Sequence, residues 1–122
     1  MTTESKKSQY VLLFHHSVEG PDPSPAEMEL IMGRWMAWMK SIGGRGQMVG
    51  HNRLQDTGKV LRGPGGKAVT DGPYVESKEI VGGYILINAD NYAEAVEIAR
   101  GCPGLDDGIA VEVRAVEPLS EL

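Results

Sequence analysis

The 122-residue sequence contains very little cysteine, few aromatic side chains and no long apolar run. Its single cysteine, Cys102, cannot form an internal disulfide, which is typical of a protein in a reducing compartment. No apolar segment approaches the roughly 20 residues of a membrane-spanning helix, and no apolar amino-terminal block resembles a secretion signal. We therefore expect a cytoplasmic protein without a membrane partner.

The sequence also lacks any concentration of positive charge. Its formal net charge is −5, and its 12 lysines and arginines are scattered along the chain. Nucleic-acid binding requires a basic patch, so no nucleic-acid partner is expected. Internal repeats and low-complexity tracts are absent as well. The remaining composition, 41% hydrophobic and 24% charged, is that of one ordinary globular domain.

Apolar periodicity predicts two helices and several strands. Ser24 is a natural N-cap, Pro25 suits the first helical position, and Glu27 completes a capping box. This first helix ends at Gly43–Gly44, and a second helix spans 92–100. The main strands are expected at 10–16, 47–55, 82–88 and 109–116, with shorter segments at 59–62 and 67–70. The turn at 56–59 predicts a hairpin between strands 47–55 and 59–62.

This order predicts an α+β fold, the ferredoxin-like β-α-β-β-α-β arrangement with both helices on one face of an antiparallel sheet. The other face carries apolar side chains from the first and fourth strand candidates, 10–16 and 82–88. A second copy of the same sheet is the economical cover, which predicts a homodimer with a cleft between the sheets. We expect the domain to span 9–117, with a disordered tail at 1–8 and a short tail at 118–122.

Two neighbouring histidines end the first strand. Because side chains alternate along a strand, His15 and His16 point to opposite faces, and at most one of them enters a given cleft. The alternation does not decide which one.

On the last strand, Glu112 and Arg114 face the side that is expected to meet the second sheet. A buried arginine requires a carboxylate partner or holds an anionic ligand, and the internal ion pair is the favoured interpretation.

The segment from 71 to 84 breaks the backbone twice and contains four charged side chains, which indicates the lip of a site. At Asp71-Gly72-Pro73-Tyr74 the chain resembles the YCII-related proteins, in the branch named after the tetrapeptide Asp-Gly-Pro-Phe. The resemblance covers 9–117 and extends to further motifs: Tyr10–Phe14, Trp35-x-x-Trp38, Glu76-x-Lys78-Glu79, Gly82-Gly83-Tyr84, Glu94-Ala95-Val96, Cys102-Pro103 and Val111–Arg114. The signature departs from the family pattern at Tyr74, which replaces phenylalanine.

The resemblance implies a dimeric α/β barrel of ferredoxin-like units, in agreement with the fold expected from the residue patterns. Relatives of that fold include muconolactone isomerases and small dehydrochlorinases. In the broader YCII group a His–Asp pair in the cleft has been proposed as acid–base machinery. Some members of the branch carry a transcription-initiation label, which the charge pattern of this chain does not support.

These observations predict a set of candidate site residues. A histidine beside a carboxylate is a general base near neutral pH, so the catalytic candidates are His15, His16 and Asp71. For Asp71 alone, capping its own turn is the slightly favoured alternative. Side chains expected to bind a small, anionic organic substrate are Tyr74, Glu76, Lys78, Glu79, Glu112 and Arg114.

Other chemistries are not predicted. The histidines and acidic residues show no recognised metal-ligand spacing, and no cofactor motif is present, so neither a metal nor a cofactor is expected. Cys102 sits at a helix end where a small buried thiol is the ordinary case. The sequence therefore supports two functions: a small lyase or isomerase that moves a proton, or a non-catalytic binding or regulatory module using the same cleft. A purely structural role for residues 71–79 is the third hypothesis.

Overall fold

The computed structural model describes residues 8–17, 20–72 and 79–118. Predictions that fall on residues 1–7, 18–19, 73–78 and 119–122 lie outside these described residues. The described residues form six strands, two α-helices and two short 3-10 helices: β1 (Ser8–Ser17), α1 (Pro25–Gly44), β2 (Met48–Arg53), β3 (Gly58–Arg62), η1 (Pro64–Gly66), β4 (Ala68–Gly72), β5 (Glu79–Ala89), α2 (Tyr92–Arg100), η2 (Pro103–Asp107) and β6 (Ala110–Ala115).

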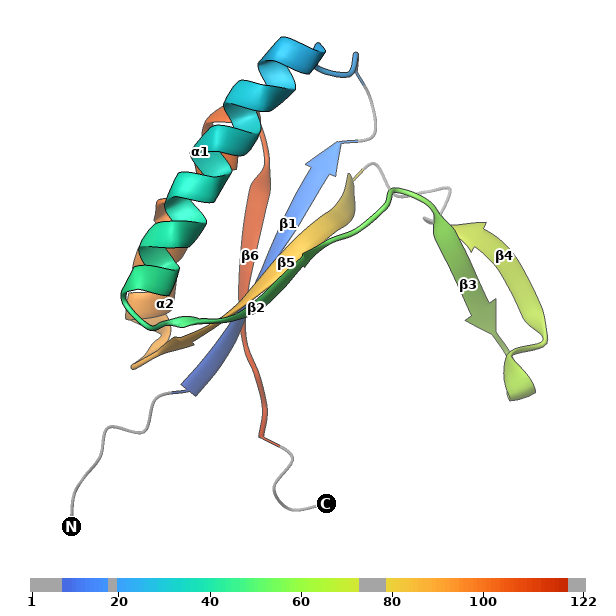
Figure 1. Ribbon diagram of the computed structural model, residues 1–122. Coiled ribbons are helices and arrows are strands. Elements are labelled where there is room, and N and C mark those ends of the chain that lie inside the picture. The colour runs from blue at the N-terminus through green and yellow to red at the C-terminus, as the bar shows by residue number, and fades with distance from the viewer. Residues whose placement is uncertain (1–7, 18–19, 73–78, 119–122) are drawn as a thin grey trace.

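Four of the strands form the main antiparallel sheet, in the order β2-β5-β1-β6. Both helices lie on the same side of this sheet (Figure 1). The order places the first and third strands of a β-α-β-β-α-β unit at the centre, which is the ferredoxin-like topology. The predicted α+β fold class is confirmed.

The remaining two strands make a separate hairpin. β3 pairs only with β4, with Leu61 opposite Val69, and the two strands stand apart from the main sheet (Figure 1). The predicted hairpin between 47–55 and 59–62 is therefore wrong. The turn residues after β2 connect two different sheets, because β2 takes its hydrogen bonds from β5 instead.

The hydrophobic core lies between the sheet and the helices. Leu12, Ile85 and Ile87 are fully buried on the strands, and Ile42 is fully buried on α1. Trp38 anchors α1 to α2, because its indole Nε1–H donates to the Ile98 carbonyl oxygen at 3.2 Å. Edge-to-face contacts among Phe14, Trp35 and Trp38 extend this packing. The aromatic pair of the first helix therefore belongs to the core.

The helices begin where local chemistry places them. The Ser24 hydroxyl accepts a hydrogen bond from the Glu27 backbone N–H, and the Glu27 carboxylate accepts one from the Ser24 backbone N–H. This is the predicted capping box. At α2 the Asn91 side chain accepts from the Glu94 N–H. No helix within 8–17, 20–72 and 79–118 is long and apolar enough to cross a lipid bilayer.

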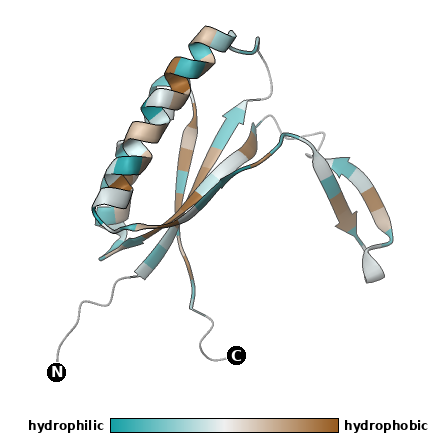
Figure 2. Cartoon of the chain, viewed as in Figure 1, coloured by the Kyte–Doolittle hydropathy of each residue, from teal (hydrophilic) through white to brown (hydrophobic). Residues whose placement is uncertain are grey.

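The sheet face opposite the helices is uncovered by the part of the chain that the structure describes (Figure 1). We call it the open face. It is a mixed surface of half-buried apolar groups and polar groups. Figure 2 shows that the strands of the sheet carry both hydrophobic and hydrophilic residues. Strand alternation and register assign to it Val11, Leu13, His15, Asn52, Tyr84, Leu86, Asn88, Glu112 and Arg114.

Candidate functional site

A histidine, a glutamate and an arginine meet on the open face. The His15 imidazole Nε2–H donates to Glu112 Oε1 at 2.8 Å. The other carboxylate oxygen, Glu112 Oε2, lies 3.7 Å from Arg114 Nε. Glu112 therefore links an imidazole to a guanidinium within one line of side chains, which we call the open-face triad (His15, Glu112 and Arg114).

The register of the β1–β6 pair creates this arrangement. Leu13 lies opposite Glu112, and Val11 lies opposite Arg114. His15 is two residues beyond Leu13 on the same face, so it reaches Glu112 diagonally across the two strands. Glu112 and Arg114 are also two residues apart and share that face. The triad thus rests on two neighbouring strands of a rigid sheet.

The two histidines have different environments. His15 is 25% exposed, and no partner of its Nδ1 is found among the described residues. His16 uses both ring nitrogens: Nδ1–H donates to the Ser17 carbonyl oxygen at 3.0 Å, and Nε2 lies 3.2 Å from Asp56 Oδ1. Of the two candidates, His15 is the one that keeps a nitrogen available on the open face.

The structure places Asp71 away from the open-face triad. Asp71 lies on β4 of the separate hairpin, where its carboxylate is 85% exposed and pairs with the Lys59 ammonium across the two strands. Glu79 begins β5, is exposed, and lines a cavity of about 280 Å³ beside the hairpin. The other candidates of this segment, Tyr74, Glu76 and Lys78, lie outside the described residues.

One polar contact on the open face escaped the sequence analysis. The Asn52 amide Nδ2–H donates to the Tyr84 hydroxyl oxygen at 2.9 Å, joining β2 to β5. Asn52 lies opposite Tyr84 in the antiparallel pair. The alternation of side chains along this strand could place Tyr84 on the open face from the sequence alone. Asn52 could be identified as its partner only once β2 was known to pair with β5.

The described residues offer little other catalytic chemistry. No three His, Cys, Asp or Glu side chains within them gather closely enough to hold a metal ion. Cys102 is buried, and burial raises the pKa of its thiol. A thiol in that state is a poor nucleophile because little of it is ionised at neutral pH.

The open-face triad has the chemistry of an acid–base site. An ionised carboxylate only accepts hydrogen bonds, so a proton on His15 Nε2 satisfies Glu112 and leaves Nδ1 with a lone pair. A ring nitrogen with a free lone pair is able to accept a proton. Arg114 is 65% exposed, and within the described chain only its Nε approaches a carboxylate. A guanidinium group of this kind can bind a carboxylate through two parallel hydrogen bonds.

The chain belongs to the YCII-related domain family, whose family model matches residues 6–120. The match covers nearly the whole sequence, so the resemblance based on its motifs is confirmed at the level of the family. A search of curated proteins finds no match to this chain.

Proposed function

We propose that this YCII-related protein is a homodimeric acid–base enzyme of the lyase or isomerase type. The observation that carries the proposal is the 2.8 Å hydrogen bond between His15 Nε2 and Glu112 Oε1 on an uncovered sheet face. Proton abstraction requires a base in a fixed position, and a carboxylate that holds an imidazole in one tautomer provides it. The chain's Asp71-Gly72-Pro73-Tyr74 sequence differs from Asp-Gly-Pro-Phe only at Tyr74, which supports a place in the family branch named after that tetrapeptide.

In the proposed reaction, His15 Nδ1 removes a proton from a carbon next to a carbonyl or carboxylate group. Glu112 stabilises the imidazolium that forms and keeps the ring oriented. Arg114 binds the anionic end of the substrate through its terminal nitrogens. Returning the proton to a different carbon gives an isomerase, and loss of a leaving group gives a lyase. Asp71 pairs with Lys59 on the separate hairpin, so this proposed reaction gives it no step.

The tautomer of His15 provides the first test, and it needs no substrate. We expect ¹⁵N NMR of the imidazoles at neutral pH to show a protonated Nε2 and an unprotonated Nδ1 for His15. Glu112→Gln should disturb this tautomer preference, whereas Glu97→Gln on the exposed surface of α2 should not. A proton on Nδ1 in the wild type would contradict the role of His15 as the base.

A chemical test follows from the same geometry. In deuterium oxide, a panel of small keto acids and unsaturated lactone acids should include compounds whose C–H exchanges faster with the protein than without it. His15→Gln should reduce that exchange by roughly 10²- to 10⁴-fold, the usual contribution of a general base. Glu97→Gln is the matched control, with exchange as in the wild type. If compounds bind at Arg114 but His15→Gln leaves their exchange unchanged, the protein is a binding module.

A further inference from the structure

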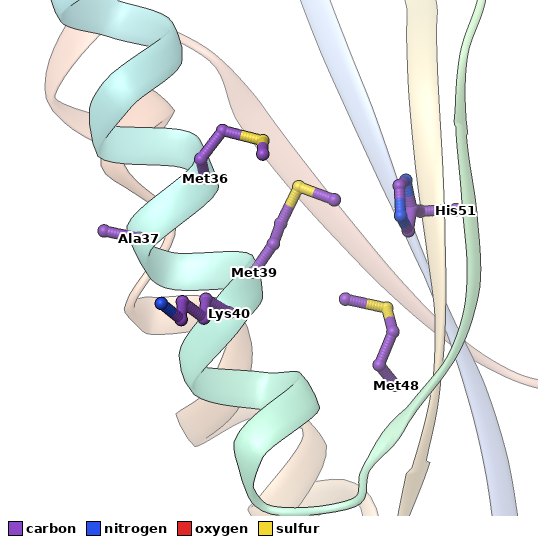
Figure 3. Close-up of a pocket in the computed structure, with 6 residues that line it drawn as sticks. All are labelled: Met36, Ala37, Met39, Lys40, Met48 and His51. Atoms are coloured by element: carbon purple, nitrogen blue, oxygen red, sulfur yellow. The ribbon is translucent and has the colours of Figure 1, made fainter.

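A second cavity lies on the helix side of the sheet, on the opposite side from the open-face triad. It has a volume of about 380 Å³ and separates the middle of α1 from the edge strand β2 (Figure 3). Three methionines and a histidine dominate its lining. The lining residues are Met36, Ala37, Met39, Lys40, Met48 and His51. This cavity therefore concentrates half of the chain's 6 methionines.

Local geometry turns these side chains toward one space. Met36 and Met39 are three residues apart on α1 and share one helical face. Met48 and His51 are also three apart, a spacing that would send them to opposite faces of a regular strand. A register shift between Met48 and Gly50 restores a common face, so both side chains point toward α1. Figure 3 shows the three sulfur atoms and the imidazole around the same opening.

Core packing accounts for two of these methionines, because Met39 and Met48 are half-buried and pack against the hydrophobic core. Met36 is not explained in this way, because it is 61% exposed. The His51 imidazole is exposed as well, and within the described residues it makes no hydrogen bond or ion pair. Lys40, the charged residue of the lining, directs its ammonium away from His51 (Figure 3). Met36 and His51 are thus exposed, while Met39 and Met48 are half-buried and face the same cavity.

The chemistry of these donors selects a particular class of ligand. Thioethers are soft ligands that favour Cu(I), and imidazole also suits copper. Calcium and magnesium require oxygen ligands, and no carboxylate lines the cavity. We propose that Met36, Met39, Met48 and His51 form a binding site for a soft monovalent metal ion, Cu(I). The site is separate from the open-face triad, so it does not depend on the function proposed above.

The decisive experiment uses Ag(I) as a redox-inert probe on the full-length chain, in chloride-free buffer and with ¹³C-labelled methionine methyl groups. One equivalent of Ag(I) should shift the methyl signals of Met36, Met39 and Met48, while those of Met28 and Met32 stay in place. The ring ¹⁵N signals of His51 should shift at the same stoichiometry. A wild-type protein that shows no shifts at all would overturn the proposal.

Competition with a chromophoric Cu(I) chelator under ascorbate then measures affinity. Met39→Leu combined with Met48→Leu retains the apolar volume of the cavity but removes two soft donors. We expect it to weaken Cu(I) binding by more than roughly tenfold, the size of effect that even outer-shell substitutions produce. His51→Gln tests the fourth donor at an exposed position, where folding is not at risk.

Two control variants make the result specific. Met32→Leu removes a thioether from the same helix but outside the cavity, and it should bind Cu(I) as the wild type does. Cys102→Ala removes the buried thiol of the chain's single cysteine and should also leave binding unchanged. Full binding by the Met39→Leu/Met48→Leu protein, or loss of binding in Cys102→Ala, would place the metal elsewhere and refute the site.

Discussion

Neighbouring residues of one strand have very different chemical surroundings in this protein. Strand alternation sends His15 to the open face and His16 toward the end of β2, where Asp56 and the Ser17 carbonyl oxygen hold both of its ring nitrogens. Gly82 permits this second arrangement, because a Cβ at that position would lie 2.7 Å from His16 Cδ2. One histidine is thus fixed by its neighbours while the other keeps a nitrogen for chemistry.

Ser24 and Glu27 allow a residue-scale prediction for stability. Hydrogen bonds from the Ser24 backbone N–H and hydroxyl lower the pKa of Glu27 below its ordinary value of 4.5. Because the folded state has the lower pKa, the stabilisation is fully present above the unfolded value and is lost as pH falls through the folded one. The free energies of unfolding of the wild type and of Glu27→Gln, measured in urea, should therefore differ at neutral pH and become equal in acid.

The cap itself should contribute independently of that titration. Ser24→Ala removes the hydroxyl that accepts from the Glu27 N–H and should lower the free energy of unfolding by about 1 kcal/mol. Ser41→Ala, an exposed serine near the other end of the same helix, is the matched control and should cost nothing. Equal losses from both serines would show that the cap is not the source of the effect.

At the scale of elements, α1 and η2 respond differently to an added methyl group. A Cβ on Gly33, in the middle of α1, would meet nothing within 4 Å, so Gly33→Ala should stabilise the protein by roughly 0.5–1 kcal/mol. A Cβ on Gly104 would lie 2.7 Å from the Trp35 ring and 2.8 Å from Ile109 Cδ1. Gly104→Ala should destabilise by about 1–3 kcal/mol through overpacking. Thermal unfolding of the two variants checks the opposite signs.

The elements also show which parts of the fold the sequence can predict. The start of α1 follows from Ser24, Pro25 and Glu27, all of which act within a few residues of the chain. The erroneous hairpin at 56–59 had equally good local turn chemistry. The outcome there depends on β5, which begins at Glu79 and offers β2 a longer and better buried partner than β3 does. Local sequence patterns cannot show whether β2 pairs with the nearby β3 or with the more distant β5.

The same limit applies to the candidate site. Alternation along β6 was sufficient to place Glu112 and Arg114 on the uncovered face. It could not show that Glu112 is the partner of His15, because those residues are 97 positions apart and meet only through the β1–β6 register. Asp71 was the predicted histidine partner, and its catalytic role stays a prediction.

At the scale of the whole molecule, one broad sheet face with half-buried apolar side chains lacks a cover in the described chain. Leu86 lies near its centre on β5, opposite Val11 and Gly50. If two protomers pack through this face, Leu86→Lys brings two unpaired ammonium groups into the interface. We expect the dimer to weaken by at least about 100-fold, or roughly 3 kcal/mol. Sedimentation velocity over a range of concentrations measures this change.

Leu105→Lys is the matched control, because Leu105 is an exposed leucine on η2, away from the open face. It should sediment as the wild type does. The Leu86→Lys protomer should keep its fold, since its lysine reaches solvent when no second sheet is present. A cleft between two sheets further requires that Leu86→Lys weaken binding of small carboxylates at Arg114. A monomeric wild type, or a Leu86→Lys protein that dimerises normally, would rule out this face as the interface and leave the open-face triad exposed to solvent.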